Sequence, residues 1–211
     1  MGNILSRLLY TLPAVLLAIS LHEFAHGWVS WKLGDPTPKA TGRISLNPFH
    51  HLDLWGTLCL IVFHFGWAKP VQINTWYYKN RKLGTVLVSL AGPGMNFLLA
   101  FLATFLQGVV LRVTGGYVGQ AGYYLYMLLA YIAAINLGLG VFNLIPIPPL
   151  DGSKVLGALL PEELYFRYMR LERYGFILLV VLLATPLLDR PLSLATGLLQ
   201  QLFWWVTGLL L

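Results

Sequence analysis

The residues best able to do chemistry are His22, Glu23 and His26, which form a His-Glu-x-x-His pattern near the end of a long apolar stretch. Side chains four positions apart lie on one face of a helix, so both imidazoles can reach a single Zn²⁺. Glu23 would then reach a metal-bound water and act as general base. This arrangement is typical of a zinc hydrolase.

The apolar surroundings of this pattern strengthen the prediction. An ionisable group near the centre of a bilayer costs roughly 2.5 to 3.5 kcal/mol on insertion scales, so such groups usually serve a function. The alternative is that His22 and His26 only pack between helices, with Glu23 neutral in a polar pocket. We expect a metal site instead, because two neutral imidazoles and a carboxylate hold zinc and leave a fourth position for water.

Asp151 is the candidate for the third ligand. It lies in the proline-broken run from Asn143 to Gly152, which follows a long apolar segment. Pro-Leu-Asp-Gly is also good turn chemistry, so Asp151 would otherwise be a turn or helix-capping residue. We expect it to bind zinc, because a hard oxygen ligand completes a His₂-carboxylate site and the other carboxylates that look buried are Glu23 and Asp53.

Asn143 has two equally good interpretations. Its amide can donate a hydrogen bond to an oxyanion that develops during hydrolysis. It can instead satisfy backbone groups that Pro146 and Pro148 leave without helical partners.

Composition predicts a membrane protein. Of the 211 residues, 57% are hydrophobic and 10% are charged, far fewer charges than the roughly 25% of a soluble domain. The formal charge of +6 comes from short scattered clusters, which favours loops near anionic lipid and argues against nucleic-acid binding. A single cysteine, Cys59, excludes an internal disulfide and a thiolate zinc cluster.

The hydrophobic pattern predicts an all-α polytopic membrane protein with about five to six transmembrane helices. Thr41 to Pro48 alternates like a short strand or β-hairpin, and Leu54 to Trp67 has the length of a re-entrant segment. We expect one domain over residues 1–211, with a core of about 4–155 and accessory helices at about 172–211. The expected helices are Ile4 to about Leu33, Leu83 to about Val113, Ala121 to about Ile145, Tyr174 to Leu188, and Leu192 to Leu211.

Positive charge predicts how the chain crosses the cell membrane. The loops at 69–82 and 154–173 are rich in Lys and Arg, which assigns them to the cytoplasm. The histidines and Asp151 can share one depth only if Leu54 to Trp67 re-enters without crossing. The amino terminus is then outside, the carboxy terminus inside, and the active site toward the cytoplasmic face.

Together these motifs resemble the site-2 protease family of intramembrane zinc metalloproteases, over most of residues 18–155. The resemblance implies one Zn²⁺ per chain held by His22, His26 and Asp151, with Glu23 as catalytic base and Asn143 near the scissile carbonyl of a transmembrane protein substrate. The matching runs are His22 to Gly27, Gly42 to Pro48 with His51 and Asp53, Gly66 to Val71, Ala91 to Asn96, and Asn143 to Gly152.

The closest variant of that family is its compact prokaryotic form. The Asn-Pro-x-x-His-x-Asp run that ends in His51 and Asp53 looks like an extra polar motif of this subgroup, which would hydrogen-bond a zinc ligand. A structural turn capped by Asp53 is equally plausible. Asn96 follows Gly92 and Gly94, whose small size lets helices approach closely, and it either bridges helices or faces the site.

A helical substrate must unwind before it is cut, and Thr41 to Pro48 is the candidate edge for strand pairing. The rival function is a metal-ion or proton transporter, since intramembrane His, Asp and Glu also build ion pathways. A transporter would distribute these groups across the bilayer, whereas here they concentrate near one face. The sequence specifies no oligomeric state.

Overall fold

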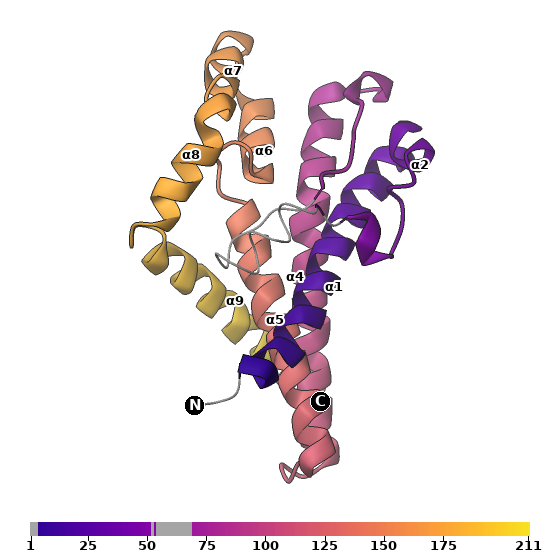
Figure 1. Cartoon of the computed structure of the whole chain (residues 1–211), viewed down its shortest axis with the longest axis vertical. Helices are drawn as coiled ribbons and strands as arrows, with labels where there is room; N and C mark the ends of the chain where they lie inside the picture. The colour runs from indigo at the N-terminus through magenta and orange to yellow at the C-terminus, as the bar shows by residue number, and fades with distance from the viewer. Residues whose placement is uncertain (1–3, 52, 54–68) are drawn as a thin grey trace.

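Three long helices form the centre of the computed structural model, which describes residues 4–51, 53 and 69–211 (Figure 1). They are α1 (Ile4–Lys32), α4 (Arg81–Val113) and α5 (Gln120–Asn143), and these three are long and apolar enough to cross a membrane. The described part of the chain contains no strand. Its other elements are α2 (Thr37–Ala40), η1 (Pro48–His50), η2 (Thr75–Tyr77), α6 (Asp151–Leu159), α7 (Glu162–Met169), α8 (Glu172–Leu183) and α9 (Asp189–Leu210).

Local signals in the sequence set the ends of the long helices. α1 ends just before Gly34, whose φ of +107° suits glycine and breaks the helical path. Asn80 caps α4 by accepting a hydrogen bond from the Leu83 N–H at 3.0 Å. The three central helices therefore begin and end within a few residues of the positions expected from hydrophobicity and from Gly and Pro.

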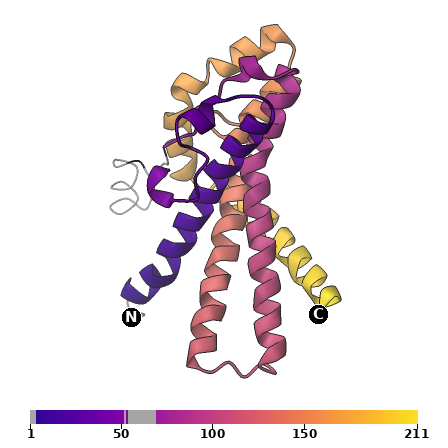
Figure 2. The same ribbon diagram turned by 90° about the vertical axis from the view of Figure 1, so that its right-hand side faces the viewer.

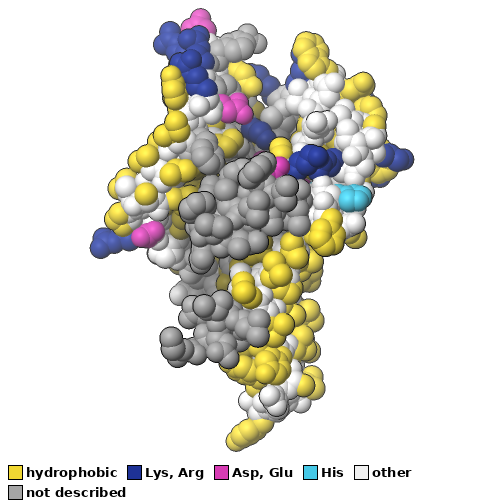
Figure 3. Space-filling view, in the orientation of Figure 1, with side chains coloured by type: hydrophobic (Ala, Val, Ile, Leu, Met, Phe, Trp, Pro, Cys, Tyr) yellow, Lys and Arg dark blue, Asp and Glu magenta, His cyan; other side chains and the backbone are white. Residues whose placement is uncertain are grey.

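The helices pack through small side chains and turn their large apolar side chains outward. Ala14, Ala18 and Ala100 are completely buried, whereas Leu12 and Leu102 are about half exposed. Small interfacial residues let helices approach closely where lipid, rather than water, surrounds them. On the face in Figure 3, charged side chains gather over the upper half and the lower half is mainly apolar, as expected of a membrane protein.

The last two helices differ from the expected pair of membrane spans. α8 has 12 residues, and α9 is not among the helices apolar enough to cross a membrane. The two follow one another from the upper end to the lower end, so they make no hairpin (Figure 1). The beginning of α1 and the end of α9 consequently lie toward the same end (Figure 2), unlike the opposite placement of the two termini expected from the sequence, and five to six spans are not confirmed.

These accessory helices nevertheless brace the core. α9 packs on α4 where a side chain at Gly108 would collide with Thr207, and Phe101 meets Phe203 edge to face at 5.5 Å. Gly175 in α8 lies so close to the carbonyl of Pro148 that a Cβ there would clash with it. The segment that leads to Asp151 is thus supported from its outer side.

The predicted strand at Thr41 to Pro48 is wrong. Residues 41–47 form a turn and irregular chain, and residues 48–50 form η1, capped by Asn47. A strand needs a partner, but here the Arg43 N–H bonds to Pro38 within its own loop and the Asn47 N–H bonds to the Ser45 hydroxyl. The predicted re-entrant segment at Leu54 to Trp67 lies outside the described residues.

Asp35 joins the end of α1 to the segment that precedes α4. Its fully buried carboxylate accepts hydrogen bonds from the Ser30 hydroxyl at 2.8 Å, the Thr37 N–H at 2.9 Å and the Asn74 N–H at 2.7 Å. The Ser30 and Tyr78 hydroxyls are 2.7 Å apart. Burial alone would raise the pKa of Asp35, but these hydrogen bonds outweigh it and lower the pKa below its ordinary value.

Replacing Asp35 by Asn is expected to destabilise the protein. A lost hydrogen bond to a charged group costs about 2 kcal/mol, which lowers the melting temperature by roughly 4 to 8 °C in a chain of this size. Because the folded pKa is depressed, the contribution of Asp35 is complete above its unfolded pKa of about 3.9 and is lost as pH falls through the lower folded value. Thermal unfolding at several pH values measures it.

The matched control is Asp189→Asn, because Asp189 is exposed. It should leave the melting temperature unchanged. A loss that is equal for both variants, or a loss for Asp35→Asn that persists unchanged at the lowest pH, would contradict the role of the buried carboxylate.

Candidate active site

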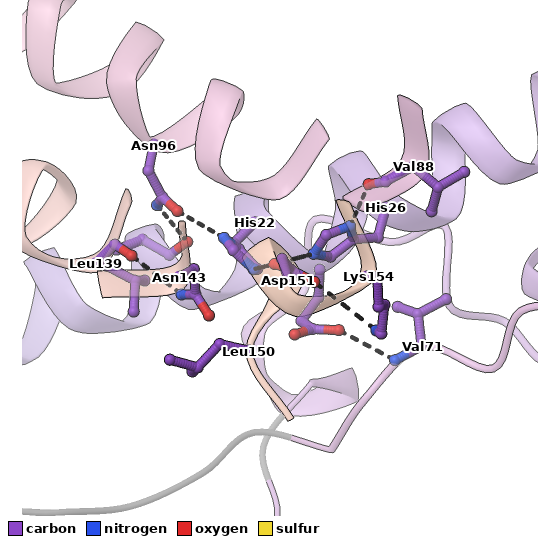
Figure 4. Close-up of polar contacts among 12 residues, drawn as sticks. His22, His26, Val71, Val88, Asn96, Leu139, Asn143, Leu150, Asp151 and Lys154 are labelled. Carbon is purple, nitrogen blue, oxygen red and sulfur yellow. Dashed lines mark hydrogen bonds and ion pairs between the residues drawn. The ribbon is translucent and has the colours of Figure 1, made fainter. Parts of the chain in front are cut away.

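His22, His26 and Asp151 converge on one point inside the helix bundle (Figure 4). The two Nε2 atoms are 3.0 Å apart, and Asp151 Oδ2 lies 3.2 Å from His22 Nε2 and 3.1 Å from His26 Nε2. All three side chains are buried. Residues separated by more than 120 positions in the sequence are thus brought together, as the sequence analysis required of a metal site.

This triangle fits zinc. With ligand bonds of about 2.0 to 2.1 Å, a tetrahedral ion separates its ligand atoms by about 3.3 Å, close to the three observed edges. A nitrogen and oxygen donor set is one that zinc accepts. His₂-carboxylate sites also leave a fourth position for water.

The hydrogen bonds of the imidazoles explain why their Nε2 atoms face one another. His22 Nδ1 donates to Asn96 Oδ1 at 2.6 Å, and His26 Nδ1 donates to the Val88 carbonyl at 2.7 Å. Each ring therefore directs an Nε2 lone pair toward the carboxylate of Asp151. Three electron-rich atoms this close repel each other unless a metal cation or a proton lies between them.

Asn136 is a site residue that the sequence analysis missed. It is completely buried and accepts a hydrogen bond from Asn96 Nδ2 at 2.8 Å, which fixes the orientation of the Asn96 amide toward His22. Asn136 in turn donates to the Ile132 carbonyl at 2.9 Å. The signal was an amide in the middle of an apolar helix, seven residues before Asn143 and therefore on the same face.

Two glycines let the ligands meet. A Cβ on Gly92 in α4 would lie 2.6 Å from His22 Nε2 and closer still to His26 Nε2. A Cβ on Gly152 would lie 2.7 Å from the Ile145 carbonyl oxygen and closer to Leu144. The first glycine makes room for the imidazoles, and the second lets α6 begin directly against the end of α5, which brings Asp151 to the site.

The charge on Asp151 is favoured by its neighbours. Burial alone would raise the pKa of this carboxyl, whereas N–H donation or positive charge at the two Nε2 atoms lowers it well below its ordinary value, and bound zinc would supply that positive charge in place of the protons. Its other oxygen, Oδ1, lies 3.8 Å from Lys154 Nζ. The carboxylate is therefore ionised at neutral pH, as a metal ligand must be.

Glu23 points toward a different partner from its two flanking histidines. Its Oε2 accepts a hydrogen bond from the Val71 N–H at 3.0 Å, and it lines the same cavity of about 400 Å³ as the three clustered side chains. Residues 69–74 are irregular chain, and Pro70, Val71 and Ile73 border this cavity. The carboxylate is thus held beside the cluster without joining it.

Asn143 also borders the cavity, at the last residue of α5. Its Nδ2 donates to the Leu139 carbonyl at 3.0 Å, one turn earlier in its own helix. This carbonyl is not one that Pro146 or Pro148 leaves without a helical partner, since those belong to Phe142 and Leu144, so the bond from one amide N–H decides between neither interpretation. An amide carries two such groups, so the other stays compatible with a role toward substrate.

His51 and Asp53 are not part of the cluster of potential ligands. His51 is completely buried, and its Nε2 donates to the Ser45 carbonyl at 2.8 Å, which ties its own loop together. Asp53 is partly buried. The hydrogen bond seen for His51 matches the structural-turn alternative better than contact with a zinc ligand.

Comparison with known proteins identifies the class. Residues 109–184 match the model of peptidase family M50. The chain is 40% identical over 185 residues to the Bacillus subtilis protein named "Putative zinc metalloprotease YwhC", covering 87% of this chain and 84% of that one. It is 32% identical over 181 residues to "Putative zinc metalloprotease Rip2" of Mycolicibacterium smegmatis, covering 83% and 66% of the two chains.

A more distant relative is "Zinc metalloprotease MJ0392" of Methanocaldococcus jannaschii, with 30% identity over 151 residues that cover 71% of this chain and 34% of that protein. No solved structure matches the chain. The chain belongs to peptidase family M50, the site-2 proteases. It is a zinc metallopeptidase with membrane helices, which confirms the class, the enzyme type and the metal predicted from the sequence.

Replacing Gly92 by Ala is expected to weaken zinc binding by at least about tenfold, because the new methyl group would push both imidazoles away from Asp151. Gly94→Ala is the matched control in the same helix, since nothing lies within 4 Å of a Cβ there. Zinc content of the purified variants, and competition with a chelator, measure the difference. Equal zinc affinity in the two variants would contradict the close packing of α4 on the histidines.

Proposed function

We propose that this protein is an intramembrane protease that hydrolyses peptide bonds in or near the transmembrane segments of membrane proteins. The observation that carries the proposal is the cluster of His22, His26 and Asp151, buried among helices long and apolar enough to cross a membrane. A metallopeptidase whose metal site is enclosed by such helices is suited to substrates that are themselves in the membrane.

Under this proposal His22, His26 and Asp151 hold the zinc, and Glu23 acts as general base. Bound zinc would supply Lewis acidity that polarises the scissile carbonyl and makes water more acidic. The Glu23 carboxylate takes a proton from the attacking water and later gives it to the leaving amine. The Val71 N–H keeps one carboxylate oxygen of Glu23 in place, so the other can face the water.

Asn143 is proposed to stabilise the oxyanion. It borders the cavity together with Glu23, and the N–H that is not bonded to Leu139 can donate to a substrate oxygen. The buried pair Asn96 and Asn136 is proposed to position His22 and to fix its tautomer. We also propose that Asp53 supports the site by hydrogen-bonding a zinc ligand, as expected from the sequence.

The substrate segment must leave its helix to expose a carbonyl, because helical carbonyls are already hydrogen-bonded. The chain at residues 70–74 is the better candidate for guiding it, since Pro70, Val71 and Ile73 border the catalytic cavity. None of the residues 41–48 is among the described residues that line this cavity. We therefore assign the guiding role to residues 70–74 in place of the loop expected from the sequence.

The active site is proposed to lie toward the cytoplasmic face of the cell membrane. The end of the helix bundle that carries the site also carries Lys79, Arg81 and Lys82 before and at the start of α4. Cytoplasmic loops are enriched in such cations. The transporter alternative is not favoured, because the described ionisable cluster forms one closed site and the relatives are named as metalloproteases.

Replacing Glu23 by Gln is expected to lower cleavage of a model transmembrane peptide by at least about a thousandfold while zinc content stays near one per chain, because the amide cannot accept the proton from water. His22→Ala and Asp151→Ala should lose both zinc and activity. Peptide cleavage in vesicles, together with metal analysis of the same samples, measures the two properties.

The control is Glu163→Gln, which makes the same change at an exposed glutamate outside the cavity. It should keep both zinc and activity. Full proteolysis by the Glu23 variant would reject Glu23 as the base, and cleavage of soluble unfolded proteins in preference to membrane peptides would reject the proposed substrate class.

A further inference from the structure

A second cavity, of about 490 Å³, adjoins the catalytic cavity and is strongly cationic. Arg81, Lys82 and Lys154 line it, and none of the described residues in its lining is Asp or Glu. Thr75, Thr85 and Lys154 border both cavities. The two cavities are therefore contiguous, and the cationic one begins where the catalytic one ends.

Lys154 marks the boundary between the two cavities. Its ammonium lies 3.8 Å from Asp151 Oδ1, on the side of the carboxylate away from the histidines, and its side chain is 45% exposed. Figure 4 shows this contact beside the cluster of His22, His26 and Asp151. A chain that passes out of the catalytic cavity along Lys154 enters the cationic cavity directly.

Arg81 is held in a position that suits the binding of a carboxylate. Its guanidinium carbon lies 3.6 Å from the centre of the Trp76 ring, so a cation–π contact holds the group against the indole. A guanidinium held in this way keeps N–H groups for a planar, two-point partner. In the part of the chain that the structure describes, no carboxylate forms an ion pair with Arg81 or Lys82.

We propose that the cationic cavity is a specificity site that binds an acidic side chain of the substrate, an Asp or Glu close to the scissile bond. This inference rests on the proposed function. An extended chain rises about 3.3 Å per residue and the two cavities share lining residues, so the acidic residue lies within a few positions of the cleaved bond. The bound carboxylate pairs with Arg81 and Lys82, while Lys154 stays next to Asp151.

A substrate side chain fits these observations better than a lipid headgroup. The cavity is continuous with the place where the peptide must lie, through Thr75, Thr85 and Lys154. A binding site that serves the peptide needs this continuity, whereas a lipid site does not. The planar Arg81 edge also matches a carboxylate, although a phosphate would satisfy the same donors.

The test uses the full-length zinc enzyme in phosphatidylcholine vesicles with a set of model transmembrane peptides. The peptides differ only in carrying Asp, Asn or Lys at each of the positions within five residues of the cleaved bond. At one or two adjacent positions the enzyme should cleave the Asp peptide with a kcat/KM at least about tenfold above that of the Asn peptide. Equal rates at all positions would overturn the inference.

Substitutions in the protein then show which residues cause the preference for the Asp peptide. Arg81→Gln and Lys82→Gln should reduce the Asp-to-Asn ratio toward one, and Arg81→Glu should shift the preference toward the Lys peptide. Lys79→Gln is the control, because Lys79 lies in the same loop but outside the lining of this cavity, and it should keep the full ratio. Zinc content and melting temperature show that each variant is folded. An unchanged ratio in folded Arg81→Glu would contradict the assignment.

Two other results of this experiment would contradict the inference in different ways. Suppose that phosphatidylglycerol stimulates the wild type but not Arg81→Gln, with equal rates for Asp and Asn peptides. The cavity then binds a lipid headgroup and the inference is wrong. If the wild type cleaves none of the membrane peptides yet retains zinc, the proposed substrate class itself fails, which removes the basis of this inference as well.

Discussion

The geometry of the site depends on the repulsion between three electron-rich atoms, which a metal ion held among them would relieve. His22 and His26 donate their Nδ1 hydrogens to Asn96 and Val88, so their Nε2 lone pairs meet Asp151 Oδ2 at 3.0 to 3.2 Å. Without a positive charge between them this arrangement costs energy, and burial makes the cost larger. Zinc held by these three residues, as proposed, would link α1 to the beginning of α6, and its removal would then take away an attraction between two distant parts of the chain.

A short polar connection inside the apolar helix bundle supports this site. The bond from Asn96 to Asn136 crosses from α4 to α5, and each amide is completely buried. Such amides are tolerated among apolar helices when their hydrogen bonds are satisfied, and both make a further bond to a helix carbonyl. The same connection holds the two helices in register and orients His22, so stability of the bundle and geometry of the metal site are coupled.

Features that depend on neighbouring residues were predicted better from the sequence than contacts between distant parts of the chain. Spacing alone paired His22 with His26, and hydrophobicity predicted the bounds of the three long helices to within a few residues. The strand at Thr41 to Pro48 failed because alternation says nothing about whether a partner strand exists. The sequence analysis missed Asn136 and the packing of Gly92 against the histidines. The role of each residue depends on which helix lies opposite it in the fold. The pair of spans expected from Tyr174 to Leu211 is not confirmed, because hydrophobicity does not reveal the direction in which a helix leaves a turn.

Two hydrogen bonds connect the segment before α4 to the part of the chain that carries Glu23, the proposed base. Asp35 fastens the Asn74 N–H to the end of α1, while Val71, three residues earlier, donates to Glu23 in the same helix. Val71 is thus attached to α1 and Asn74 to the chain just after α1, and Val71 and Ile73 both border the cavity. A substrate that pairs with this segment would press on both attachments. If Glu23 is the base, as proposed, the position of its carboxylate depends in part on how firmly Asp35 holds the chain, and a buried structural carboxylate would then support catalysis.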